Sequence, residues 1–130
     1  MSTDERSRHS ILTVFLEDFD SIRGDMQNFR EMSTECSNRQ QIHVRVQGSV
    51  VRLLENLRHE RSVLEIRLRG LQDGLRSLLR WGDRMRVIRD NMLQNRQEEI
   101  SVLRYQLATL ASHLHFVESW RQELEWIRFA

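Results

Sequence analysis

Apolar residues recur at alternating three- and four-residue steps along the last thirty residues of the chain, with one gap at Arg121. This spacing indicates a helix whose apolar seam packs against another helix. A second apolar arc lies about 100° around the same helix, so the helix needs two neighbours, from its own chain or from other copies. The seam, which we assign to self-association, consists of Ile100, Leu103, Leu107, Leu110, Leu114, Val117 and Leu124, and the second arc consists of Val102, Tyr105, Phe116, Trp120 and Ile127.

The same periodicity predicts two earlier helices separated by a polar linker. The first extends over residues 3–32, and Ser2 with Glu5 has the spacing of a capping box at its start. Residues 33–41 lack apolar periodicity and form the linker. The second helix extends over residues 42–80; its first residues also alternate as a strand would, but a lone strand has no partner here. Its seam consists of Val50, Leu54, Leu57, Leu64, Leu68, Leu71, Leu75 and Leu78.

The connection to a third helix, predicted over residues 84–129, has two alternatives. In the favoured one, Gly82 ends the second helix and Asp83 caps the third, so that the two helices pair as an antiparallel hairpin. In the other, one helix continues through Gly82, because the flanking apolar residues keep the heptad phase. The phase then slips over residues 94–99, where a supercoil would unwind locally or a new helix would begin.

These elements predict an all-α fold, an elongated helical bundle or coiled coil of two or three long helices, in a single domain over residues 1–130. A continuous helix over residues 84–129 would be about 69 Å long. That length exceeds the diameter of a compact globular protein of this mass. The predicted helix length therefore indicates an elongated bundle or an intermolecular coiled coil.

Composition adds the expected compartment. No apolar run approaches the roughly 20 residues that span a bilayer, and the polar N-terminus lacks the pattern of a secretory signal. The only cysteine, Cys36, cannot form an internal disulfide, so we expect an intracellular protein, cytoplasmic or nuclear. The chain has no proline and is lysine-free: all 20 basic residues are arginine, a side chain that makes bidentate and stacked contacts at interfaces.

Charge is segregated along the chain although the net charge is only +1. Residues 1–38 carry four arginines and eight acidic residues, whereas residues 39–90 carry twelve arginines and six acidic residues. The favoured interpretation is a solvated basic face balanced by the acidic first helix. The alternative is an anion-binding stripe for nucleic acid. The candidate stripe, opposite the leucine seam, consists of Arg58, Arg69, Arg76, Arg80 and Arg84.

Catalytic and metal sites are disfavoured by spacing. His113 and His115 point about 160° apart on a helix, whereas a shared metal site needs one face. The sequence has no glycine-rich phosphate loop, and Cys36 has no base and acid at suitable spacing. We therefore predict no enzymatic activity, no cofactor and no metal.

Two local features suggest partner binding. Trp120, Trp126 and Phe129 are candidate partner-binding residues near the C-terminus, although Trp120 also suits the second apolar face as core. The other feature resembles the death-motif helix by which apoptosis regulators dock into a partner groove, and the resemblance implies an exposed segment. It is carried by Leu78, Trp81, Gly82, Asp83 and Met85, while Gly74 departs from the pattern at the first apolar anchor.

The sequence thus predicts a non-catalytic helical module for oligomerisation and protein–protein interaction, such as a scaffold, adaptor or structural assembly protein. We expect a homo-oligomer that also binds other proteins through its helical surfaces. The alternative function is nucleic-acid binding through the arginine-rich helix face.

Overall fold

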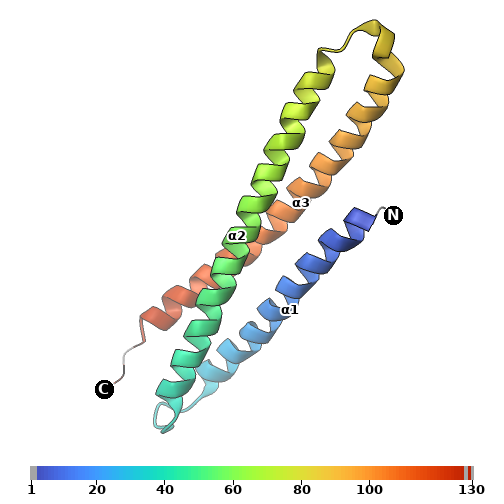
Figure 1. The fold of residues 1–130 in the computed structure, drawn as a ribbon. Helices are drawn as coiled ribbons and strands as arrows, with labels where there is room; N and C mark the ends of the chain where they lie inside the picture. Colours follow the sequence, from blue (N-terminus) through green and yellow to red (C-terminus); the bar gives the residue numbers. More distant parts are fainter. Residues whose placement is uncertain (1–2, 128, 130) are drawn as a thin grey trace. The chain divides into compact units, whose positions relative to one another are not determined.

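The computed structural model describes residues 3–127 and 129, with side chains from Leu16 onward. The described chain is all-α, as predicted, and contains no strand. Figure 1 shows its elements in order along the chain. They are α1 (Thr3–Glu31), α2 (Arg39–Leu79), a one-turn 3-10 helix η1 (Asp83–Met85) and α3 (Arg86–Glu125).

The connection between α1 and α2 is shorter than the predicted linker. Helix α2 begins at Arg39, so the alternating residues near its start are helical and the strand alternative is wrong. Within the loop, the Cys36 amide donates to the Ser33 carbonyl at 3.1 Å, and the Cys36 thiol lies 2.7 Å from Asn38 Oδ1. Of the predicted capping box at the start of α1, Ser2 lies outside the described residues.

A turn separates α2 from α3, so the hairpin alternative is confirmed and the continuous helix is excluded. Gly82 has φ −76° and ψ 174°, an extended conformation rather than the left-handed one usual for a helix-ending glycine. Asp83 begins η1, and no side-chain hydrogen bond caps that helix. Helix α3 then runs unbroken through residues 94–99, where the change of phase allowed a break.

The chain folds as two compact units. The first unit comprises Met1–Arg58 and Ser112–Ala130, and the second comprises His59–Ala111. The predicted single domain over residues 1–130 is not tested by this division and stays a prediction.

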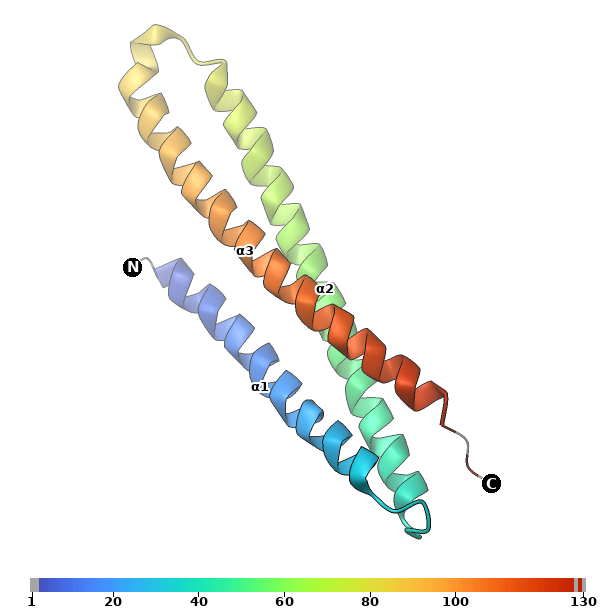
Figure 2. The same ribbon diagram turned by 180° about the vertical axis from the view of Figure 1, so that it is seen from behind.

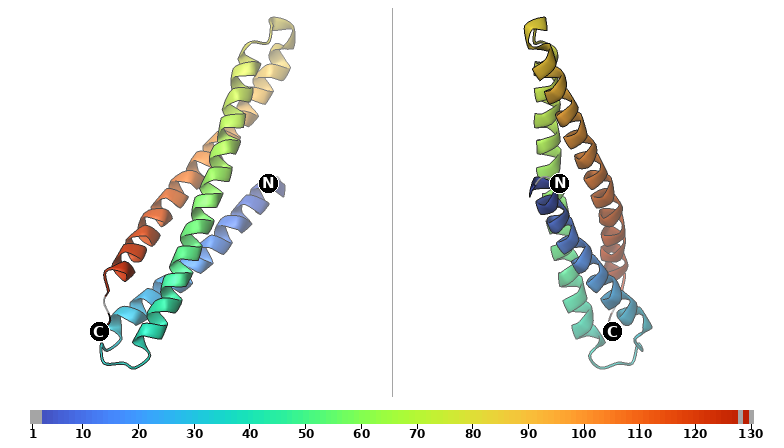
Figure 3. Two further views of the ribbon diagram at one scale, coloured as in Figure 1. Left: turned by 60° about the vertical axis from the view of Figure 1, so that its left-hand side comes forward. Right: turned by 90° about the vertical axis from the view of Figure 1, so that its right-hand side faces the viewer.

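The first unit is built from α1, the beginning of α2 and the end of α3. Figures 2 and 3 show the last part of α1 beside the beginning of α2. The Phe19 ring of α1 stacks on Trp120 of α3 with the ring centroids 4.9 Å apart. All three helices supply buried residues, which are Phe19, Ile22, Met26, Phe29, Val46, Val50, Leu53, Leu54, Leu57, Leu114, Val117, Trp120 and Leu124.

The second unit consists of two long helical segments, the end of α2 and the beginning of α3, joined by the turn and η1 (Figure 1). Its buried apolar residues are Leu64, Leu78, Ile100, Leu103 and Leu110. The remaining leucines of both seams are only half-buried: Leu68, Leu71, Leu75 and Leu107. Two helices cover each other on one side, so their flanks stay open to solvent.

Candidate interaction surfaces

The seam of α3 assigned to self-association lies largely inside the chain's own fold. Six of the seven side chains are buried, and Leu107 is half-buried. These residues are therefore covered by the same polypeptide, and a partner would have to use the open flanks rather than the seam itself.

Trp120 continues this seam where the sequence suggested a gap at Arg121. Its side chain is only 7% exposed and stacks on Phe19, so Trp120 belongs to the core of the first unit, the alternative that the sequence also allowed. The steps from Val117 to Trp120 and on to Leu124 are three and four residues, the same spacing as the rest of the seam. That spacing was the signal that could have identified it.

The other two candidate aromatic residues differ from each other in exposure. Phe129 is half-buried, with its ring edge-on to His43 at 5.0 Å between centroids. The Arg39 guanidinium lies 5.7 Å from the centre of the same ring. Trp126, in contrast, is 81% exposed. Of the three predicted partner-binding residues, only Trp126 offers most of its side chain to solvent.

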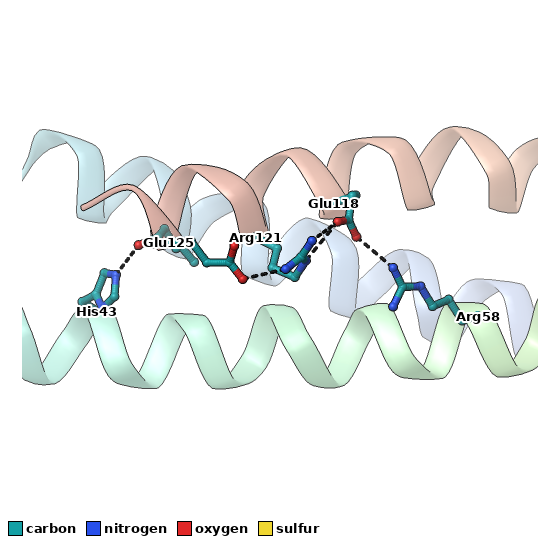
Figure 4. A network of polar contacts seen from close by, with 6 residues as sticks. His43, Arg58, Glu118, Arg121 and Glu125 are labelled. Carbon is teal, nitrogen blue, oxygen red and sulfur yellow. Dashed lines mark hydrogen bonds and ion pairs between the residues drawn. The ribbon is translucent and has the colours of Figure 1, made fainter. Parts of the chain in front are cut away.

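A polar network ties the helices of the first unit together (Figure 4). Arg58 of α2 donates to Glu118 of α3 at 3.0 Å, and Arg121 bonds both Glu118 and Glu125, the latter at 2.6 Å. The hydrogen bond from Arg121, and secondarily the two nearby guanidinium charges, lower the pKa of Glu118 below its usual value. Arg58 of the candidate anion-binding stripe thus has an acidic partner within the chain.

Two further polar contacts in the first unit join distant segments. Arg30 of α1 makes a bidentate pair with Glu123 of α3, with N–O distances of 2.8 to 3.1 Å. The hydrogen bonds to Glu123 raise the pKa of Arg30. The buried His43 donates from Nε2 to the Leu124 carbonyl at 2.8 Å. These contacts are explained by packing and need no ligand.

The other four arginines of the candidate stripe are exposed in the second unit. Arg76 pairs with Asp73 at 3.4 Å. Arg84 belongs to η1 rather than α2, so the stripe does not continue along one helix. Within the part of the chain that the structure describes, Arg80 and Arg84 form no ion pair.

Exposed apolar side chains gather around the turn of the second unit. We call residues 79–89 the hairpin tip. Within it, Leu79, Trp81, Met85, Val87 and Ile88 are all exposed. Arg89 Nη1 donates to the Trp81 carbonyl at 3.0 Å and so fixes the turn from the side of α3.

The resemblance to a groove-binding death-motif helix is not supported by this geometry. Leu78 is buried, and α2 ends at Leu79, before Trp81 and Gly82. The residues of the motif therefore do not form one exposed helical face.

The flank of the second unit carries a groove of about 430 Å³ between α2 and α3. Leu75 and Ile100 provide apolar surface in it, and the other residues that line it are polar. The polar residues that line it are Gln72, Arg76, Gln97, Ser101 and Arg104. An apolar floor with a polar rim is the usual anatomy of a protein-binding surface.

Among the described residues, no group of three or more histidine, cysteine or acidic side chains is placed to hold a metal ion. His113 instead packs edge-on against Phe19, and His115 lies beside Phe116.

None of the described helices combines the length and apolar character needed to cross a membrane. Comparison with known protein families, curated proteins and solved structures finds no match to this chain.

Proposed function

We propose that the protein is a non-catalytic helical interaction module that self-associates through the open flank of its second unit. The observation that carries this proposal is the half-burial of Leu68, Leu71, Leu75 and Leu107 in a pair of helices. Burial of apolar surface stabilises a protein by about 25 cal/mol per Å². Leucine side chains that stay partly exposed to solvent do not gain this free energy in full.

The first unit shows what a third helix does for such a seam. There α1 contributes Phe19, Met26 and Phe29 to the core, and the seam leucines Leu54 and Leu57 of α2 are buried. The second unit has no described third helix. A helix or hairpin from another molecule would complete it in the way that four-helix bundles are completed.

A second copy is the partner that best fits this surface. Pairing about a two-fold axis would bring the same groove, with Leu75 and Ile100, against itself. The rim is mixed, with Gln72 and Gln97 beside Arg76 and Arg104, so neutral amides can separate the like charges. Other helical proteins with a matching face would bind the same flank, as a scaffold or adaptor requires. We expect this to occur inside the cell, in cytoplasm or nucleus, where the single Cys36 would remain reduced.

Mass in solution tests the proposal. Analytical ultracentrifugation at micromolar concentration is expected to give a dimer or larger species. Replacing the half-buried leucines in the double variant Leu71→Gln/Leu75→Gln should shift the mass to that of the monomer. Ile66→Gln is the matched control, because Ile66 is exposed on the opposite face of α2, and it should leave the mass unchanged. A monomeric wild-type protein at these concentrations would contradict the proposal.

Nucleic-acid binding is the second candidate, supported by the exposed arginines Arg76, Arg80 and Arg84. It predicts affinity for RNA or DNA that falls steeply with salt. Changing these three arginines to glutamine should abolish it. Absence of binding at low salt would exclude this candidate.

A further inference from the structure

We propose that the hairpin tip, residues 79–89, docks on the surface of a lipid bilayer that carries anionic headgroups. This inference is independent of self-association, because it rests on the turn of the second unit rather than on its flank.

The tip presents apolar side chains in a form that a bilayer interface can accept. Val87 is 74% exposed and Leu79 is 64% exposed, with Ile88 more than half exposed. Helical side chains lean toward the helix N-terminus, so Val87 and Ile88 in the first turn of α3 lean toward the connection. Trp81, in that connection, is a residue type enriched at the membrane–water interface.

The charge of the same segment is strongly one-sided. Residues 79–89 contain four arginines and a single acidic residue, Asp83. Among the described residues, Arg80, Arg84 and Arg86 form no ion pair, and all three are exposed. Arginine can lay its aliphatic stem along hydrocarbon while its guanidinium reaches a phosphate or carboxylate. Basic residues beside apolar ones are the combination that binds anionic membrane surfaces.

The local backbone holds this surface in place. The Met85 amide donates to the Gly82 carbonyl at 3.1 Å, and Trp81 is held by both its amide and its carbonyl. The amide bonds the Leu78 carbonyl, and the carbonyl accepts from Arg89. The exposed apolar side chains therefore project from a defined turn.

Other partners would bind either the arginines or the apolar side chains of the hairpin tip, but not both. The acidic α1 of a second copy could pair with the arginines, but among its described side chains the one large exposed apolar residue is Leu16, at 37% exposure. Nucleic-acid phosphates would likewise leave Val87 and Ile88 in contact with water. A bilayer interface supplies anionic oxygens and hydrocarbon together.

Vesicle flotation with the full chain tests this inference. We expect the protein to float with vesicles of phosphatidylcholine mixed with phosphatidylserine and not with phosphatidylcholine alone. Changing Arg80, Arg84 and Arg86 to glutamine should weaken partitioning on the order of 100-fold, since each arginine near an anionic surface contributes about fivefold. Val87→Gln/Ile88→Gln should weaken it by at least about tenfold, because membrane affinity scales with buried apolar area.

The control variant is Ile66→Gln/Tyr105→Gln, which changes two exposed apolar residues of the second unit outside the tip. It should float as the wild type does. The self-association variant Leu71→Gln/Leu75→Gln should also float, which separates this inference from the proposed function. Circular dichroism checks that each variant keeps its helix content.

Three results would overturn the inference. The first is absence of flotation with anionic vesicles, and the second is flotation that neither tip variant reduces. The third is binding to single-stranded RNA that displaces the vesicles and depends on the arginines but not on Val87 and Ile88. That result would assign the tip to nucleic acid.

Discussion

Trp120 occupies the position at which the apolar seam of α3 would otherwise be interrupted by Arg121. Its indole stacks on Phe19 and is nearly excluded from solvent. We expect Trp120→Ala to lower the free energy of unfolding by about 3–5 kcal/mol, the usual cost of removing a large buried aromatic side chain. Urea denaturation measures it. Trp126→Ala, at an exposed site just after the end of α3, should change stability by no more than about 0.5 kcal/mol. Equal losses in the two variants would show that Trp120 is not core.

We expect Glu118 to make the stability of the fold depend on pH. Its pKa is lowered, chiefly by the hydrogen bond from Arg121, so the folded state favours the ionised form. The stability it contributes is present above the ordinary carboxyl pKa and is lost as the pH falls through the lowered folded-state value. Glu118→Gln should therefore destabilise at neutral pH by no more than about 1 kcal/mol, because the pair is largely solvated. The difference from wild type should shrink in acid, as followed by thermal unfolding. A difference that grows in acid would contradict this assignment.

Sequence patterns identified the apolar residues but not which of them had to be buried. The sequence pattern placed Trp120 on a second arc and left a gap in the seam at Arg121, yet the tryptophan one residue earlier continues the seam. The Arg121 guanidinium instead donates hydrogen bonds to the carboxylates of Glu118 and Glu125 on the same helix. The three- and four-residue steps through Trp120 permitted its place in the seam, but its burial also depends on the residue that faces it, Phe19, which periodicity within α3 does not reveal.

Two glycines of α2, Gly70 and Gly74, differ in the space available for a Cβ atom. Gly70 has nothing within 4 Å of where a Cβ would stand, whereas at Gly74 a Cβ would lie 3.3 Å from Arg96 Nη1. Gly70→Ala should raise stability by up to about 1 kcal/mol through helix propensity. Gly74→Ala should gain less, since the Arg96 guanidinium must first move. Equilibrium unfolding compares them. A larger gain at Gly74 would mean that Arg96 does not lie across this turn of α2.

Helix existence was predictable here, whereas the connection between α2 and α3 was not decided by the pattern. Leu78 and Met85 keep the heptad phase across Gly82, so periodicity alone permitted one long helix. The turn is stabilised by contacts made after the chain reverses, such as the bond from Arg89 to the Trp81 carbonyl. The predicted capping role of Asp83 failed because the chain inserts η1 before α3. Short 3-10 turns of this kind are common at helix ends.

At the scale of the whole molecule, the sequence could not tell which neighbour covers each leucine. A helix packs by the same three- and four-residue spacing whether its partner belongs to its own chain or to another. The prediction of two neighbours for α3 is met in the first unit, where Phe19 of α1 and His43 of α2 contact α3 and where Val117 and Leu124 are buried. In the second unit α2 is the one described neighbour, and Leu107 stays half-buried. The apolar side chains that still need a partner to bury them therefore lie in the second unit.

This division predicts how thermal stability depends on protein concentration. If second copies cover the flank of the second unit, association favours the folded state and the melting temperature rises with concentration. For a dimer of this size a tenfold increase should raise it on the order of 3 °C. The Leu71→Gln/Leu75→Gln variant should melt at one temperature at every concentration, because its flank no longer gains by association. Ile66→Gln should behave as wild type. Differential scanning calorimetry over a concentration series provides the measurement, and a wild-type melting temperature independent of concentration would mean that the half-buried leucines are stable without a partner.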